Sequence, residues 1–285
     1  MLFSIYQYAP ILFVFGLCLG SFLNVVIYRY PLMMQQAWQA QCDTFSFLPQ
    51  AANDQAVLAF NLCVPASHCP SCKKAIPWWR NIPLLSYLLQ RGRCHACQTL
   101  IPLSYPLVEL LAGSLVVLSF VSMGWNLSGV ATVCFSLILL ALMFIDIKTL
   151  LLPDDLTLSL LWLGLLSSLF PLFIQPKEAI LGAVVAYLSL WGVGRGFYFL
   201  THREGMGYGD YKLAAAIGAW IGWQAFPLFI LIAAILALFV GGAVLLLKKK
   251  DFRTMLPFGP FLAFSGWLMF MWGHPIQTAW YGLIL

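Results

Sequence analysis

The stretch VATVCFSLILLALMFI, residues 130–145, contains no charged residue and ends directly at Asp146. A helix needs about 20 mostly apolar residues to cross the hydrocarbon core of a bilayer. The stretch is close to that length, and the charged residues that follow it, Asp146 and Lys148, are typical of a helix leaving the membrane. It therefore predicts a transmembrane helix with an acidic residue at one end.

Seven further apolar runs lie on either side of this stretch. We place them at residues 11–28, 106–123, 156–174, 179–200, 213–223, 228–247 and 258–272. Of the 285 residues, 62% are hydrophobic and 9% are charged, whereas soluble domains carry about 25% charged residues. Helices satisfy their own backbone hydrogen bonds in lipid. The sequence therefore predicts an all-α polytopic membrane protein with about eight transmembrane helices.

The basic residues predict the orientation of these helices. If the N-terminus lies outside and eight helices alternate, fourteen of the fifteen Lys and Arg residues fall on the inner side, and only Lys177 falls outside. Basic residues concentrate in the cytoplasmic loops of membrane proteins. We therefore interpret the net charge of +5 as a signal of topology and expect no nucleic-acid partner.

The longest inner segment joins the first two apolar runs, from about residue 30 to residue 105. Its first half is rich in Gln and Ala without a clear period, and we predict an irregular segment with at most a short helix. Its second half contains a repeat, because CPSCKKAIP at 69–77 is echoed by CHACQTLIP at 94–102. The repeat predicts a small loop domain with two similar turns.

The two C-x-x-C pairs of this repeat supply four thiolates, which suits tetrahedral Zn²⁺. A closed four-sulfur site leaves no position for a water molecule, so we predict one structural zinc ion that stabilises a loop too small to build its own core. Two disulfides are an alternative that an inner location disfavours, and a redox dithiol needs only one such pair. The predicted ligands are Cys69, Cys72, Cys94 and Cys97.

Acidic residues are scarce, with ten in the chain, and two of those at predicted inner helix ends form a candidate pair. These are Asp146 and, in the stretch GMGYGDYK at 205–212, Asp210. Each alone would more often be a helix cap or an ion-pair partner, and Asp154 and Asp155 are expected to cap the helix that follows Pro153. Two carboxylates brought close together share one proton and can activate water against an amide. The pair indicates an aspartic peptidase.

The residues around Asp210 are expected to shape that site. Gly207 and Gly209 allow an unusual turn and the close approach of an extended peptide backbone. Lys212 follows two residues after the acid. We therefore predict that Gly207, Gly209 and Lys212 shape the site or contact substrate.

Six stretches spread over nearly the whole chain resemble the bifunctional type 4 prepilin leader peptidases. They are GSFLNVVIYRYP (20–31), FNLCVPASHCPSC (60–72), GRCHACQTLIPLSYPLVELL (92–111), IDIKTLLLPDDLT (145–157), EGMGYGDYKLAAAIGAW (204–220) and LPFGPFLA (256–263). The paired cysteine motifs together with G-x-G-D are more specific than either alone. The resemblance implies a multi-pass enzyme of the bacterial inner membrane, with a periplasmic N-terminus and with the zinc loop and aspartates at the cytoplasmic face.

The resemblance also implies the substrate and the site residues. Such enzymes cut the short basic leader from prepilins and pseudopilins and then methylate the new N-terminal residue, usually Phe, with S-adenosylmethionine, for type IV pilus or type II secretion assembly. The two catalytic aspartates of the family fall on Asp146 and Asp210. Its zinc cysteines fall on the four cysteines of the repeat. Membrane lipid is the other expected partner.

The methyltransferase activity has a weaker basis in the residues. The chain lacks a strand and glycine-rich turn of the Rossmann type, so the cofactor pocket must come from the zinc loop and the inner ends of the first helices. Candidate residues are Asn24, Arg29, Gly92 and Glu109, although Asn24 is better explained as a helix–helix hydrogen bond. We expect three regions: residues 1–30, the first helix; 31–105, the zinc loop, associated with methylation; and 106–285, a seven-helix peptidase domain.

Two other functional classes remain open at this point. A non-catalytic, membrane-anchored zinc-ribbon scaffold would need the cysteines but neither Asp146 nor Asp210. A transporter with a proton relay would place its acidic residues near the middle of helices, whereas these two lie at helix ends. The enzyme is the hypothesis that uses both the aspartates and the cysteines.

Overall fold

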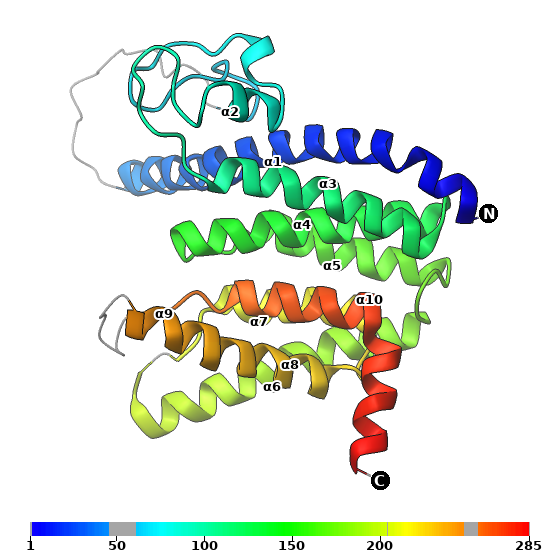
Figure 1. The fold of residues 1–285 in the computed structure, drawn as a ribbon. Coiled ribbons are helices and arrows are strands. Elements are labelled where there is room, and N and C mark those ends of the chain that lie inside the picture. Colours follow the sequence, from blue (N-terminus) through cyan, green and yellow to red (C-terminus); the bar gives the residue numbers. More distant parts are fainter. Residues whose placement is uncertain (1, 46–60, 204, 248–255, 285) are drawn as a thin grey trace. The chain divides into compact units, whose positions relative to one another are not determined.

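The structure, a computed structural model, describes residues 2–45, 61–203, 205–247 and 256–284. Part of the segment predicted to be irregular, residues 46–60, lies outside these ranges. The chain divides at residue 118 into two compact units, which are described separately. Within the described ranges all regular structure is helical and no strand is found (Figure 1). The predicted all-α class is confirmed.

The first unit is built on α1 (Leu2–Phe45) and α3 (Ser104–Met123). Helix α1 continues far beyond the predicted run of 11–28, so the expectation of an irregular segment is wrong for residues 33–45. The stretch MMQQAWQAQ at 33–41 contains no glycine and consists mostly of Met, Gln and Ala, which favour helices. Pro31 removes one N–H donor from the helix but does not end it.

Glycines allow the backbones of α1 and α3 to approach closely. A Cβ atom on Gly16 would lie 2.7 Å from the Cα atom of Gly113, and one on Gly20 would lie 2.7 Å from the Cα atom of Glu109. Small residues four apart are a common means of packing transmembrane helices, because lipid supplies little hydrophobic drive between them. Gly16 and Gly20 therefore determine which face of α1 contacts α3.

The loop between α1 and α3 holds η1 (Trp78–Arg80), α2 (Leu85–Leu89) and two turns of the same geometry. In the first turn the N–H of Cys69 donates to Lys74 O, and in the second the N–H of Cys94 donates to Thr99 O, at 3.0 and 2.9 Å. Single antiparallel bridges, His68 to Ala75 and Arg93 to Leu100, flank the turns. The sequence repeat is thus a structural repeat.

The second unit follows from α4 onward. Its helices are α4 (Leu127–Thr149), α5 (Asp154–Leu169), α6 (Pro176–Thr201), α7 (Tyr208–Ile221), α8 (Phe226–Leu236), the π-helical η2 (Ala237–Gly241), α9 (Gly242–Leu247) and α10 (Gly259–Ile284). Helix α10 has a non-helical residue, Trp272, at a kink. Each of the eight predicted apolar runs overlaps one helix or, for 228–247, the succession α8, η2 and α9. Helices α5 and α7 end at Leu169 and Ile221, before the predicted limits of 174 and 223.

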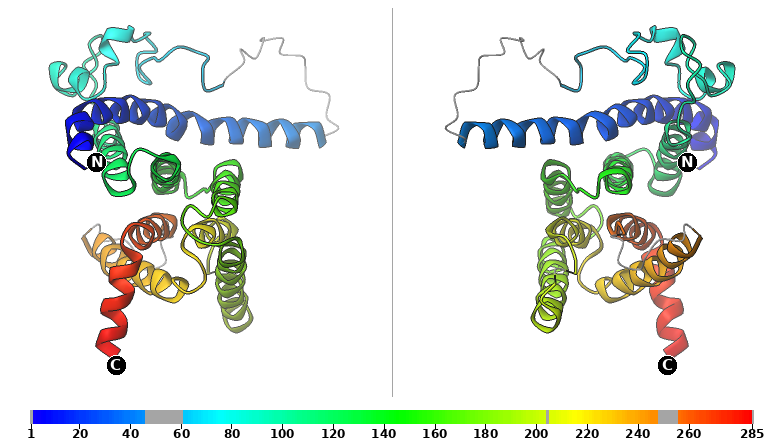
Figure 2. Two further views of the ribbon diagram at one scale, coloured as in Figure 1. Left: turned by 90° about the vertical axis from the view of Figure 1, so that its right-hand side faces the viewer. Right: turned by 90° about the vertical axis from the view of Figure 1, so that its left-hand side faces the viewer.

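Helix α7 is the centre of this unit and packs against α5, α6 and α10 (Figure 2). Its backbone approaches α6 closely, because a Cβ atom on Gly218 would lie 2.4 Å from Gly182 O. The indole N–H of the buried Trp220 donates to Leu160 O of α5 at 2.9 Å. Helix α7 ends at Gly222, which has φ +78, a backbone conformation natural to glycine. Neighbours on three sides thus determine the position of α7.

Four helices in the described part of the chain are long and apolar enough to cross a membrane: α1, α3, α4 and α6. The run 226–241 is a shorter apolar helix. Many large apolar side chains on these helices are exposed, such as Ile11, Val130 and Val193. Lipid, rather than protein, is the environment that suits these surfaces, and the chain is a membrane protein.

Candidate functional site

Asp146 lies in the last turn of α4, and only 5% of its surface is exposed. Its Oδ2 atom accepts a hydrogen bond of 3.0 Å from the backbone N–H of Gly259, the first residue of α10. The positive end of a helix dipole lies at its N-terminus. The start of α10 therefore presents a backbone N–H that has no acceptor within the helix, together with a partial positive charge, to this buried carboxylate.

Asp210 lies in the first turn of α7, half-buried, and interacts electrostatically with Asp146. The two residues are 64 positions apart in sequence. The out-and-back course of α5 and α6 returns the chain to the end of α4 from which it left. The structure thus brings together the two acids that the sequence paired, at adjoining ends of two helices.

Neither predicted site-shaping glycine has the positive φ that an unusual turn would need, since among described glycines only Gly92, Gly124 and Gly222 do. Gly207 precedes α7 with extended backbone, and a Cβ on it would meet only Asp210 Oδ2, at 3.7 Å. A Cβ on Gly209 would lie 2.9 Å from the Cβ of Leu152. Gly209 therefore permits close packing between α7 and the α4–α5 connection.

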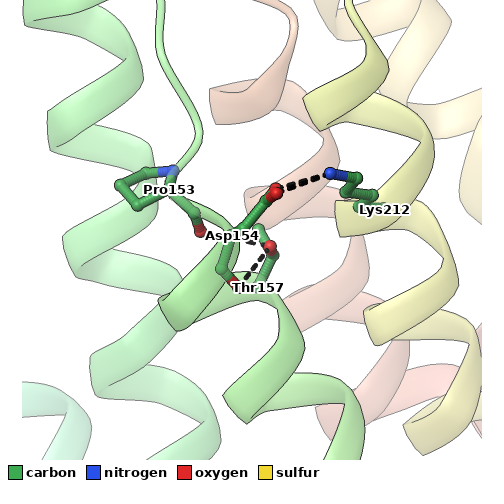
Figure 3. Close-up of polar contacts among 4 residues, drawn as sticks. All are labelled: Pro153, Asp154, Thr157 and Lys212. Atoms are coloured by element: carbon green, nitrogen blue, oxygen red, sulfur yellow. Dashed lines mark hydrogen bonds and ion pairs between the residues drawn. The ribbon is translucent and has the colours of Figure 1, made fainter. Parts of the chain in front are cut away.

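Lys212 forms an ion pair with Asp154, the first residue of α5 (Figure 3). The Nζ atom lies 2.7 Å from both carboxylate oxygens. The expectation that Asp154 caps α5 is wrong, because the capping position is held by Pro153 and Asp154 already belongs to the helix. The pair ties the first turn of α5 to the first turn of α7, which carries Asp210.

The four predicted metal ligands converge in the loop of the first unit. Their Sγ atoms all lie within 4.8 Å of one another, and those of Cys69 and Cys97 are 3.8 Å apart. Four sulfurs held about 2.3 Å from a zinc ion form a tetrahedron with edges of about 3.8 Å. The donor set and its spacing thus fit a tetrahedral thiolate-bound metal.

The surroundings of the cluster favour ionised sulfur at two of its members. Hydrogen bonds from the hydroxyl and the backbone N–H of Thr99 lower the pKa of Cys97 to about 6. Backbone N–H groups of Cys97 and Ala96 lower the pKa of Cys94. The backbone N–H of Lys74 acts in the same direction on Cys72, but desolvation and the neighbouring thiols raise its pKa to about 11. A bound divalent cation would favour the ionised form of Cys72 as well, because metals bind cysteine as the thiolate.

The candidate cofactor residues make contacts within the first unit. The amide of Asn24 in α1 donates to Tyr105 O in the first turn of α3 at 3.0 Å, so the predicted helix–helix hydrogen bond is confirmed. The buried guanidinium of Arg29 donates to the carbonyl oxygens of Asn61, Leu62 and Pro65, at 3.0, 3.3 and 2.7 Å. These two side chains hold both ends of the loop against the helices.

Glu109 and Gly92 belong to the same loop framework. The buried Glu109 accepts a hydrogen bond of 2.8 Å at Oε2 from the N–H of Leu84, directly before α2. Gly92 has φ +68, and a Cβ there would lie 2.8 Å from the hydroxyl oxygen of Tyr87. Both residues thus have a structural task, and their part in cofactor binding stays a prediction.

Two contacts of the site were not predicted from the sequence. Gly259 lies within LPFGPFLA, where a glycine before Pro260 signals the start of a helix, but only the packing of α10 on α4 brings its N–H to Asp146. The Asp154–Lys212 pair joins residues 58 positions apart. The one signal of this ion pair in the sequence is the opposite charge of two residues near helix starts: Asp154 directly follows Pro153, and Lys212 lies two residues after Asp210.

These features define a class of protein: a polytopic membrane protein with paired aspartates at helix ends and a four-cysteine loop. The family model described as "Bacterial Peptidase A24 N-terminal domain" matches residues 14–123, and that of the "Type IV leader peptidase family" matches residues 133–242. The chain belongs to the type IV leader peptidase family. No solved structure matches the chain.

Curated relatives match the chain over nearly its whole length. A protein of Aeromonas salmonicida is 45% identical over 96% of this chain and 94% of its own. Proteins of Stutzerimonas stutzeri and Pseudomonas aeruginosa are 46% and 43% identical, over 93% and 92% of this chain and 91% and 89% of their own. All three bear the name prepilin leader peptidase/N-methyltransferase.

Proposed function

We propose that this chain cleaves the basic leader peptide from type 4 prepilins or pseudopilins and then methylates the newly exposed N-terminal residue. The names and the full-length coverage of its relatives support both activities. The observation that carries the peptidase is the convergence of Asp146 and Asp210 at the ends of α4 and α7. No feature of the site favours the non-catalytic scaffold.

The two aspartates are proposed to divide the work of hydrolysis. Asp146 is the unprotonated member, because a hydrogen bond from Gly259 N–H stabilises a carboxylate. It takes a proton from water as the water oxygen bonds to the scissile carbonyl carbon. Asp210, protonated, donates a hydrogen bond to the carbonyl oxygen. The C–N bond then breaks, and the amine leaves with the proton that Asp146 had taken.

This division predicts the effect of a methyl group at Gly259. A Cβ there would lie 2.6 Å from Asp146 Oδ2, so Gly259→Ala must displace the carboxylate. We expect kcat for leader cleavage to fall on the order of 10²-fold, as small displacements of catalytic groups do. Gly192→Ala is the control, since a Cβ at Gly192 meets nothing within 4 Å. Native kcat in a folded Gly259→Ala protein would contradict the role of α10.

A second prediction concerns the ion pair beside Asp210. The pair is partly exposed, with side-chain exposures of 35% and 55%, so it contributes roughly 0–1 kcal/mol to stability. We expect Lys212→Met to lower kcat about tenfold with little change in melting temperature or KM, because the first turn of α7 loses its tie to α5. Lys212→Arg should restore most of the rate, and Lys177→Met is the exposed control. If Lys212→Met lowers the melting temperature but leaves kcat unchanged, the ion pair has only a structural role.

The metal and the methyl donor are assigned from the donor sets. We propose one structural Zn²⁺ on Cys69, Cys72, Cys94 and Cys97, which stabilises the loop when bound. S-adenosylmethionine is the methyl donor that the family resemblance implies. Asn24, Arg29, Gly92 and Glu109 are proposed to act on methyl transfer through the loop they hold in place. Methylation is thus assigned to the loop of residues 31–105, and cleavage to residues 106–285.

The proposed location follows from charge and substrate. We place the chain in the bacterial inner membrane, surrounded by lipid, with the N-terminus periplasmic and the zinc loop and aspartates at the cytoplasmic face. The distribution of Lys and Arg supports this orientation. A prepilin whose apolar helix is in the membrane leaves its basic leader in the cytoplasm, so the scissile bond lies at the same face.

The experiment that tests the function uses the purified full chain in detergent with a purified prepilin and S-adenosylmethionine. Mass spectrometry of the product reads leader loss and the added methyl group separately. We expect both, in that order, and neither in the absence of enzyme. Intact prepilin after incubation with folded protein would overturn the proposal and favour the scaffold.

A further inference from the structure

The zinc loop combines a one-sided charge with unusual apolar exposure. Between Asp54 and Glu109 the sequence has five Lys and Arg residues and no acidic residue. They are Lys73, Lys74, Arg80, Arg91 and Arg93, and only Arg80 is even partly buried. The segment stays positive when four thiolates and one divalent cation are counted. An anionic surface is the partner that this charge fits.

Large apolar side chains on η1 and α2 are exposed beside these basic residues. Trp78, Leu88 and Leu89 are 78%, 71% and 75% exposed, and Trp79 and Leu85 are about half exposed. The two helices adjoin, because Gln90, the residue after α2, donates from Nε2 to Arg80 O of η1 at 3.4 Å. We call these five residues the apolar loop surface. Exposure on this scale in water is costly, and marks a contact with a partner or a membrane.

The position of α2 along α3 places this surface at membrane level. The N–H of Leu84, directly before α2, is bonded to Glu109 of α3. Glu109 lies five residues after Ser104, where α3 begins, which is about 8 Å along the helix axis. Because α3 is one of the helices able to cross the membrane, α2 begins beside the second turn of a membrane span rather than beyond its end.

We propose that the apolar loop surface is embedded in the headgroup region of an anionic lipid leaflet. Trp and Leu side chains insert among the upper acyl chains, and the neighbouring basic residues contact lipid phosphates. Tryptophan favours this region because its ring is apolar and its N–H is polar. Basic residues near an anionic leaflet add attraction to the burial of apolar area. Lipid thereby completes the fold of a loop whose own core is a metal cluster.

Site-specific photocrosslinking tests this proposal in the full-length protein. The photoreactive amino acid p-benzoylphenylalanine replaces Leu88 in one variant and Gln98, a polar exposed residue of the second cysteine turn, in a control. Both proteins are reconstituted in nanodiscs of phosphatidylcholine with phosphatidylglycerol, irradiated, and analysed by mass spectrometry for lipid adducts. Zinc content equal to that of the unsubstituted protein shows that the loop is folded.

The expected result is a lipid adduct at position 88, none above background at position 98, and a lower yield at 88 in phosphatidylcholine alone. Equal labelling at both positions, or no lipid adduct at 88, would overturn the proposal. A crosslink from position 88 to a second copy of the chain would assign the surface to self-association instead. A yield independent of anionic lipid would refute the role of the basic residues. The crosslinking measurement needs no enzymatic activity. A result that overturns the lipid proposal therefore leaves the proposed function untouched.

Discussion

Replacing either Asp146 or Asp210 with Asn is expected to lower kcat for leader cleavage by about 10³-fold or more, because general acid–base catalysis by such groups contributes roughly 10²–10⁴-fold. An amide neither accepts a proton from water nor donates one from a shared pair. The two single variants and the double variant should be almost equally inactive, since residues that act as one unit are not additive.

Asp155→Asn is the matched control, with the same chemical change at an exposed position near the site. It should cleave at close to the native rate. Both active-site variants should still methylate a substrate that has already lost its leader. Retained methylation would show that the variants are folded and that only the cleavage chemistry is lost. If Asp155 proves essential while Asp146 is dispensable, the aspartate pair is assigned to the wrong residues.

Removing one cysteine of the cluster is the second change with a large expected effect. Metal binding supplies on the order of 10 kcal/mol of folding free energy in structural zinc sites. Cys69→Ser removes the buried member of the four, so we expect zinc to fall from one ion per chain to none and the loop to become protease-sensitive. Methylation should be lost. Cleavage should fall less, because Asp146 and Asp210 lie in the other compact unit.

Cys63→Ser is the control for this substitution, since Cys63 lies in the same loop, is exposed and is outside the cluster. It should keep its zinc and both activities. Atomic absorption of the purified proteins measures the metal, and limited proteolysis reports on the loop. Full zinc content in Cys69→Ser, or zinc loss in Cys63→Ser, would contradict the assigned ligands.

The helices and the cysteine turns were accessible from sequence because their signals are local. An apolar run of membrane length must become a helix in lipid, whatever surrounds it. The repeat at 69–77 and 94–102 folds twice in the same way, with Lys73 and Gln98 at φ 58 and 59, because its hydrogen bonds close within six residues. The extension of α1 to Phe45 was missed, because the stretch 33–41 has helix propensity but no period that separates a buried face from an exposed one.

The contacts around the two aspartates depend on tertiary structure. Sequence placed Asp146 and Asp210 at the same membrane face by counting helices and charges. It could not show that Gly259 donates to Asp146 over a separation of 113 residues, or that Asp154 holds Lys212 instead of capping α5. Propensity describes what a residue favours locally, whereas these partners are chosen by which helices pack together.

The sequence by itself thus determined the class of protein and the positions of its apolar helices, and it predicted the four clustered cysteines and the two aspartates as site residues. Each depends on composition, spacing or a repeat, and none requires knowing which helices touch. Tertiary structure alone decided how Asp146 is held, what Lys212 binds and why Gly209 must be small. The physical reason is that a hydrogen bond or a contact of a few ångströms between distant segments exists only once α4, α5, α7 and α10 have packed.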